Sequence, residues 1–180
     1  MVTTSEASLA DRLRLLRNHG SRRTGGLMSE FIEPGFNYRL GEIPAALGLS
    51  QMRRIDQILL DRRKTAGRYD QALADVQGVG VPLAGPDSSW SYQSYVVVLE
   101  DAISRDSVIT GMAAAGLETT AGTYACHQHP AYSGWGYRPG DLPNSNRFAN
   151  QTLTLPLIPR MSLSQVNRVV ETLASLLGSL

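Results

Sequence analysis

Two histidines two positions apart, His127 and His129, are the first candidates for metal chemistry in this sequence. Side chains at this spacing lie on the same face of a β-strand, so both imidazoles could reach one ion. A transition-metal site normally takes three or four protein ligands, and no acidic or cysteine partner lies nearby at a ligand spacing. Cys126 precedes His127 directly, and adjacent strand residues point to opposite faces, which disfavours a thiol–imidazole pair. We therefore expect no metal site; the histidines bind an anionic or hydroxylated substrate or form local hydrogen bonds.

The segment from Gly35 to Arg39 is a candidate for anion binding. A glycine turn before Asn37 and Arg39 can direct an amide and a guanidinium toward a phosphate or a carboxylate, because arginine offers a fork of donors to such oxygens. The alternative is an ordinary loop leading into a helix, with Arg39 in a surface ion pair. Composition alone favours that alternative.

Lysine chemistry has one candidate, because Lys64 is the only lysine among the 17 basic residues. Asp61 lies three positions before it and Arg68 four positions after it. This spacing places Lys64 on the polar face of a predicted helix, among charged neighbours. A catalytic lysine needs a dry pocket or an adjacent cation instead, so the sequence predicts no catalytic lysine in this chain.

The first half of the chain is predicted to form two helices joined by a long connection. Leucines spaced by four and three positions predict a helix over residues 6–18, which Gly20 ends. Residues 21–41 are rich in Gly, Ser and Arg and read as a long irregular connection. A second amphipathic helix is predicted over residues 42–76, with Pro44 tolerated in its first turn. Its apolar stripe comprises Met52, Ile55, Leu59, Ala66, Tyr69, Leu73 and Val76.

The second half alternates strands and helices. The pattern predicts strands over residues 92–99, 117–123 and 153–157, a helix over 104–115 and a loop over 124–144. A last helix should begin after Ser162, where Gln165 three residues on completes a capping box. This order predicts a layered α/β domain.

Composition excludes several classes of protein. The formal charge of 180 residues is +1 and the arginines are scattered, so neither nucleic acid nor an anionic membrane is an expected partner. A single cysteine excludes an intramolecular disulfide and is typical of a reducing cytoplasm, where we expect the protein. No apolar run approaches the ~20 residues of a membrane span, and the N-terminus lacks the features of a signal peptide.

Four ordered segments together resemble one known family. The run GFNYRLGEIPAALGLSQMRRIDQILLDRRKTAGRYDQAL resembles the pattern of the DegT/DnrJ/EryC1/StrS family of pyridoxal-phosphate-dependent sugar aminotransferases, with glycine, asparagine and arginine at alternate positions before an arginine-rich helix. RLRLLRNHG resembles the family's helix before a His-Gly turn, and HQHPAY resembles its substrate-side loop. LTLPLIPRMSLSQVNRVVETL resembles its closing segment, so the resemblance covers essentially the whole chain.

This resemblance implies an α/β fold, the C-terminal part of a fold-type I pyridoxal-phosphate-dependent transferase. Residues 1–41 would end the large cofactor domain and supply an interface loop, residues 42–78 would form a long connecting helix, and residues 79–180 a small α/β domain. In the family, the lysine that carries the cofactor and the aspartate facing its pyridine nitrogen lie upstream. We therefore expect a C-terminal fragment that is inactive alone and binds no cofactor covalently.

The resemblance also implies roles for four residues. Asn37 matches the asparagine that reaches the cofactor phosphate of the neighbouring subunit, and Arg39 lies beside it. His19 matches the histidine at the mouth of the active site, and His127 matches one on the sugar-nucleotide side. Many members carry a His-Tyr pair where this chain has Gly122, Thr123 and Tyr124, which leaves the substrate's identity open.

Two functions follow as expectations. In the first, the complete enzyme is a homodimer or larger homo-oligomer that transfers an amino group from glutamate to a keto-sugar nucleotide, for amino-sugar, polysaccharide or antibiotic-sugar biosynthesis. In the second, the chain is a stand-alone, non-catalytic module that dimerises with a complete homologue through its long helix and the preceding loop.

Overall fold

A computed structural model describes residues 2–23, 25, 29–83, 85, 88–138 and 140–178. The chain divides into two compact units, Met1–Arg54 and Ile55–Leu180. The division falls inside the segment that the sequence predicts as one connecting helix. Among the described residues, no helix has both the length and the apolar character to cross a membrane.

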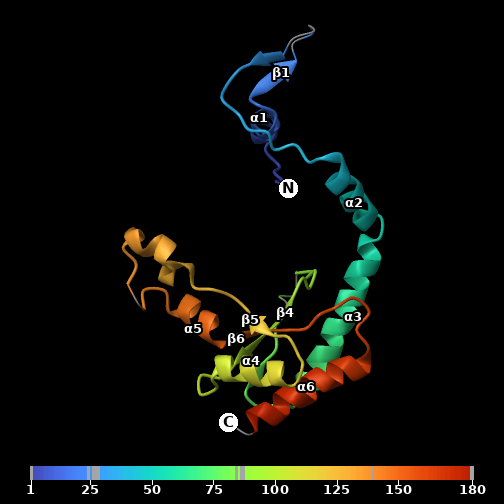
Figure 1. Ribbon diagram of the computed structural model, residues 1–180, viewed down its shortest axis with the longest axis vertical. Coiled ribbons are helices and arrows are strands. Elements are labelled where there is room, and N and C mark those ends of the chain that lie inside the picture. Colours follow the sequence, from blue (N-terminus) through green and yellow to red (C-terminus); the bar gives the residue numbers. More distant parts are fainter. Residues whose placement is uncertain are drawn as a thin grey trace. The chain divides into compact units, whose positions relative to one another are not determined.

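The described residues of the first unit form two helices and a short antiparallel pair of strands (Figure 1). Helix α1 (Ala7–Arg17) confirms the first predicted helix. The predicted irregular connection is corrected in part, because β1 (Ser21–Arg23) and β2 (Ser29–Phe31) pair antiparallel within it. Strands of three residues are too short to produce a recognisable alternation of apolar and polar side chains. Helix α2 (Glu42–Met52) ends this unit.

The prediction of a single long helix over residues 42–76 is wrong in one respect. The segment forms two helices, α2 and α3 (Ile55–Leu73). At the break, the Arg54 amide donates to the Gln51 carbonyl at 3.1 Å, a bond that spans three residues instead of four. The Arg54 guanidinium also donates to the Gln51 side chain at 2.8 Å, which stabilises this tighter turn. The predicted stripe is buried on α3 at Ala66, Tyr69 and Leu73, but Met52 is 62% exposed.

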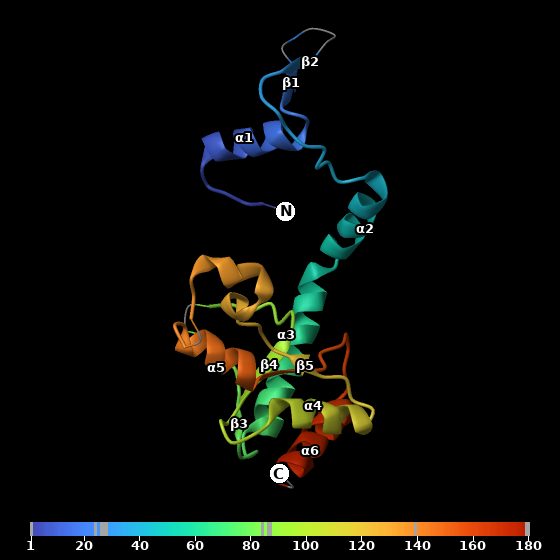
Figure 2. The same ribbon diagram turned by 60° about the vertical axis from the view of Figure 1, so that its left-hand side comes forward.

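The second unit contains a four-stranded antiparallel sheet with helices packed against it (Figure 2). Its strands lie in the order β3 (Val79–Gly80), β4 (Tyr95–Leu99), β6 (Thr152–Leu155) and β5 (Thr120–Ala121). Helices α3, α4 (Arg105–Ala114) and α6 (Leu163–Leu177) pack together against it. The predicted α/β class is confirmed.

Alternate residues of the central strands form the core. Tyr95, Val97 and Leu99 of β4 are fully buried, and in the register of the sheet Tyr95 faces Leu155 of β6. The helices contribute the remaining buried side chains, chiefly Val108, Met112, Val166, Val169 and Leu173. Each fully buried side chain of this size contributes about 1.5–3 kcal/mol of hydrophobic stabilisation. Helix α6 begins with the predicted capping box, in which Ser162 and Gln165 exchange bonds of 2.8 and 3.2 Å.

The loop predicted over residues 124–144 is more structured than its glycines and prolines suggest. It contains two 3₁₀ segments, η1 (Cys126–Gln128) and η2 (Pro130–Trp135). Helix α5 (Pro143–Gln151) follows and was not predicted. Its residues are mostly polar, and asparagine and serine have weak helix propensity, so local sequence gives little signal for it.

Two stacked tyrosines couple α3 to the sheet. The rings of Tyr69 and Tyr95 lie 4.8 Å apart. The Tyr69 hydroxyl donates to the Pro156 carbonyl at 2.7 Å, and the Tyr95 hydroxyl donates to the Asp70 carboxylate at 2.6 Å. Burial raises the pKa of Tyr69, and burial followed by the bond to Asp70 raises the pKa of Tyr95. In the folded chain, both phenols therefore keep their protons at pH values well above those at which an ordinary tyrosine loses its own.

This environment predicts a loss of stability at high pH. Tyr95 keeps its proton in the folded chain while the unfolded chain loses its own above about pH 10, so the stabilisation is complete below that pH and falls as the pH rises beyond it. Tyr95→Phe should cost about 1.5–3 kcal/mol at pH 7, because it removes a bond to a carboxylate, and should reduce the alkaline slope. Urea unfolding at pH 7, 9 and 11 measures both effects. Tyr124→Phe, at an exposed ring, is the control; an unchanged slope in a Tyr69→Phe/Tyr95→Phe double variant would contradict the assignment.

Candidate functional site

The segment of residues 35–39 is held against the C-terminal end of α1. The Phe36 amide donates to the Leu16 carbonyl at 2.7 Å, and the His19 amide donates to the Phe36 carbonyl at 2.8 Å. Asn18 and Asn37 form an isolated antiparallel β-bridge. These backbone bonds join two segments that the sequence places far apart, so the candidate anion-binding residues sit on a fixed scaffold.

Two glycines allow this approach. Gly20 has a φ of +66°, and an ideal Cβ on it would lie 1.7 Å from the carbonyl oxygen of Glu33. A Cβ on Gly35 would lie 2.1 Å from the Gly20 nitrogen. No larger side chain fits at either position without moving backbone atoms. The preceding residue, His19, also has a positive φ of 61°, so two consecutive residues of the turn after α1 adopt a left-handed backbone conformation.

A short hydrogen-bonded chain of polar side chains begins at Arg39. Its Nη1 donates to Asn18 Oδ1 at 2.6 Å, and Asn18 Nδ2 donates to Ser21 Oγ at 3.1 Å. The Ser21 hydroxyl donates in turn to the Asn18 carbonyl at 2.7 Å. The alternative prediction was a surface ion pair at Arg39. Among the described residues, Arg39 forms no ion pair, and its hydrogen-bond partner is the neutral amide of Asn18.

Asn37 and Arg39 lie on the same side of their segment, since residues two apart in extended backbone point the same way. The rings of Phe36 and Tyr38, which alternate with these two residues along the segment, stack on each other at 4.9 Å. Asn37 is exposed, and within the described residues its side-chain amide has no hydrogen-bond partner. The arrangement leaves one amide and most of a guanidinium free to donate to a ligand.

This donor set fits the phosphate end of pyridoxal phosphate. A phosphate monoester needs N–H donors and positive charge, and Asn37 with Arg39 supplies both. It provides no amine for the cofactor's aldehyde. Lys64 lies on α3 in the second unit, exposed, with no hydrogen bond or ion pair among the described residues.

His127 belongs to the second unit and lies on η1. The structure thus brings His19, Asn37 and Arg39 together in the first unit, whereas His127 is part of the second. The Nε2 atom of His127 is buried and has no hydrogen-bond partner among the described atoms. Its ring and that of Tyr137 form a T-shaped pair, with centroids 6.0 Å apart. A buried ring nitrogen without a partner is a position where a polar ligand group could bind.

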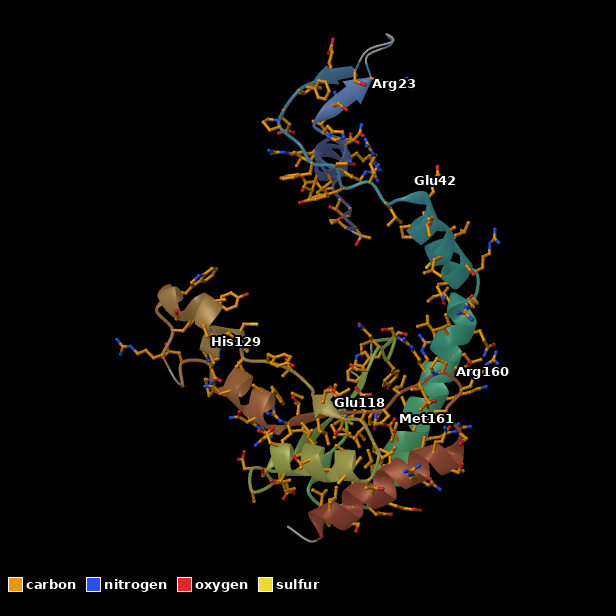
Figure 3. All side chains as sticks on the ribbon, viewed as in Figure 1. Arg23, Glu42, Glu118, His129, Arg160 and Met161 are labelled. Atoms are coloured by element: carbon orange, nitrogen blue, oxygen red, sulfur yellow. The ribbon has the colours of Figure 1, made fainter. Side chains whose placement is uncertain are left out.

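A separate cavity of about 510 Å³ lies in the second unit, near the ends of β5 and β6. Its lining includes Glu118 and Met161, labelled in Figure 3, together with Gln165 and Arg168 of α6. The buried Thr119 hydroxyl beside it has no partner among the described atoms. None of the four predicted site residues lines this cavity, so it is distinct from the residues that the sequence singles out.

The chain belongs to the DegT/DnrJ/EryC1/StrS aminotransferase family, whose model matches residues 1–174. Two curated relatives are the spore coat polysaccharide biosynthesis protein SpsC of Bacillus subtilis strain 168, at 31% identity over 95% of this chain, and the dTDP-3-amino-3,4,6-trideoxy-alpha-D-glucose transaminase of Streptomyces venezuelae, at 33% over 94%. The crystal structure of S. venezuelae DesV is similar over 96% of the chain, with a TM-score of 0.85 and 32% identity.

These matches confirm the family resemblance and the predicted fold class. The chain spans about half the length of the relatives it matches: 47% of SpsC, 43% of the transaminase and 45% of DesV. The sequence singles out Asn37, Arg39, His19 and His127 as candidates, and these stay predictions; Asn18, which bonds to Arg39 in the structure, was not among them. The only local signal for Asn18 is a polar residue directly after α1, which is common at helix ends.

Proposed function

We propose that this chain is the C-terminal half of a pyridoxal-phosphate-dependent enzyme that transfers an amino group to a keto-sugar nucleotide. Membership of the family and the names of its relatives support this reaction class. The observation that carries the proposal is the segment of residues 35–39, which is fixed on α1 and presents two donors suited to a phosphate.

Bound pyridoxal phosphate would supply an electron sink that lets an amino group leave one carbon and join another. The residues of this chain would bind and orient it. Asn37 would donate its amide to a phosphate oxygen of the neighbouring subunit's cofactor, and Arg39 would add charge and further donors. His19 and His127 would contact the sugar-nucleotide substrate, His127 through its buried, unpartnered Nε2.

A homodimer would supply that neighbouring subunit. None of the residues of α2 is buried within the described chain, although the helix is rich in apolar side chains. Ile43, Leu47 and Met52 are 86%, 63% and 62% exposed. Exposed apolar surface of this extent marks an interaction site. We propose that the upstream half of the enzyme and the second subunit cover it.

The alternative function is a non-catalytic module that docks onto a complete homologue through the same surface. The exposed position of the single lysine favours it. The DNA upstream of the Met1 codon separates the two functions. An in-frame continuation that encodes a lysine followed by a Gly-Gly pair supports the enzyme, whereas a stop codon in that frame supports the module.

Asn37→Ala tests the cofactor site directly. In the full-length enzyme, meaning this chain joined to the half that its relatives carry, the substitution should weaken cofactor binding by about 1–3 kcal/mol, roughly 5- to 150-fold, because a hydrogen bond to a charged group is lost. Equilibrium dialysis of pyridoxal phosphate measures the change. The melting temperature without cofactor should stay close to that of the wild type, because the β-bridge at Asn37 uses only backbone atoms.

Asn167→Ala, at an exposed position on α6, is the matched control and should leave both quantities unchanged. A plain turn residue at position 37 would give the opposite pattern, with a small loss of stability and unaltered cofactor binding. That result would remove Asn37 from the site.

A further inference from the structure

Asn18 contacts both candidate phosphate ligands, although it is not one of them. Its backbone forms the β-bridge to Asn37, and its side-chain oxygen accepts the 2.6 Å bond from Arg39. Backbone bonds of the flanking residues hold this bridge, with the His19 amide donating to the Phe36 carbonyl and the Tyr38 amide to the Arg17 carbonyl. The contribution of Asn18 itself is its side-chain bond to Arg39.

Ser21 fixes which way the Asn18 amide faces. Asn18 Nδ2 donates to Ser21 Oγ, whose own proton is committed to the Asn18 carbonyl. The amide oxygen therefore points toward Arg39, and the amide nitrogen cannot replace it without losing the bond to Ser21. The bond to Asn18 favours one position of the long, exposed Arg39 side chain before any ligand binds.

The neutrality of Asn18 matters as much as its position. A carboxylate at this place would hold Arg39 at least as firmly, but it would cancel much of the charge that an incoming phosphate requires. An amide holds the guanidinium and leaves its charge and its remaining donors available. No carboxylate in the described part of the chain pairs with Arg39, which is consistent with this arrangement.

We propose that Asn18 is a positioning residue for phosphate recognition: it holds Arg39 in place as a fully charged donor for the phosphate of pyridoxal phosphate. The proposal rests on the proposed function of the segment of residues 35–39. Ser21 supports it by orienting the amide.

Two substitutions separate positioning from a merely structural role. Asn18→Ala releases Arg39 but keeps its charge, and should raise the dissociation constant of pyridoxal phosphate roughly 3- to 10-fold in the full-length enzyme. Asn18→Asp keeps the bond to Arg39 but places a negative charge beside the guanidinium. The dissociation constant of pyridoxal phosphate should then rise by about 10-fold or more. The melting temperature without cofactor should follow the reverse order, with the aspartate variant at least as stable as the alanine variant.

A structural role predicts that the aspartate variant, which keeps the bond, binds cofactor like the wild type; that result overturns the proposal. Arg39→Ala makes the two failures distinguishable. If it leaves cofactor binding unchanged, Arg39 is no ligand and the proposed site itself fails. If it weakens binding while both Asn18 variants behave like the wild type, only the role of Asn18 fails. In the Arg39→Ala background, Asn18→Ala should have no further effect on cofactor affinity.

Discussion

Alanine in place of Gly20 is expected to destabilise the first unit by about 2–5 kcal/mol and to release the segment of residues 35–39 from α1. Two costs add. A left-handed backbone costs a residue with a Cβ about 1–2 kcal/mol, and forcing a methyl group into a packed contact costs about 1–3 kcal/mol more. The contact here is with the Glu33 carbonyl, 1.7 Å from the ideal Cβ, so the backbone itself must move.

Hydrogen exchange and cofactor binding report this release. The amides of His19 and Phe36, which bond across the two segments, should lose protection in Gly20→Ala, and the full-length enzyme should lose affinity for pyridoxal phosphate. Gly25→Ala is the matched control, because Gly25 also has a positive φ, +79°, but an added Cβ there would meet nothing within 4 Å. Equal losses in the two variants would show that the close approach of the backbones is unimportant.

Local sequence patterns were sufficient to predict an element where one short segment determines its structure. The capping box of Ser162 and Gln165 and the apolar run in β4 predict α6 and a central strand, and both are present. The break between α2 and α3 was missed because the apolar stripe continues across it. The residues at the break, Arg53 and Arg54, are good helix formers, so propensity gives no reason to expect a turn.

Part of the candidate site was predictable for a similar reason. Asn37 and Arg39 are two residues apart in one motif, and their side chains share one side of an extended segment. Asn18 was not predictable, because its contact with Arg39 joins residues 21 positions apart. That contact depends on the close approach of Gly20 and Gly35, which no periodicity in the sequence reports. The unpartnered nitrogen of His127 likewise follows from packing.

The 180-residue chain alone is expected to show no transaminase turnover and no covalent adduct with pyridoxal phosphate. Lys64 is its only lysine, and it lies exposed on α3. A lysine that acts on a cofactor is activated by a dry pocket or by a neighbouring cation held against it. Tyr69, five residues further along α3, is completely buried, whereas Lys64 is exposed to solvent.

The size of the effect follows from the role of the missing group. General acid–base catalysis by one positioned side chain is worth about 10²–10⁴-fold in rate, so the isolated chain should fall at least that far below the full-length enzyme. Borohydride reduction followed by mass spectrometry detects any adduct at Lys64, and a coupled assay of amino transfer measures turnover. Lys64→Ala in the full-length enzyme is the control and should retain normal turnover, because Lys64 takes no part in the reaction. The contrary result has two parts: a reducible adduct at Lys64, and turnover of the isolated chain that Lys64→Ala abolishes. Together they would overturn the assignment of this chain as the half without the catalytic lysine.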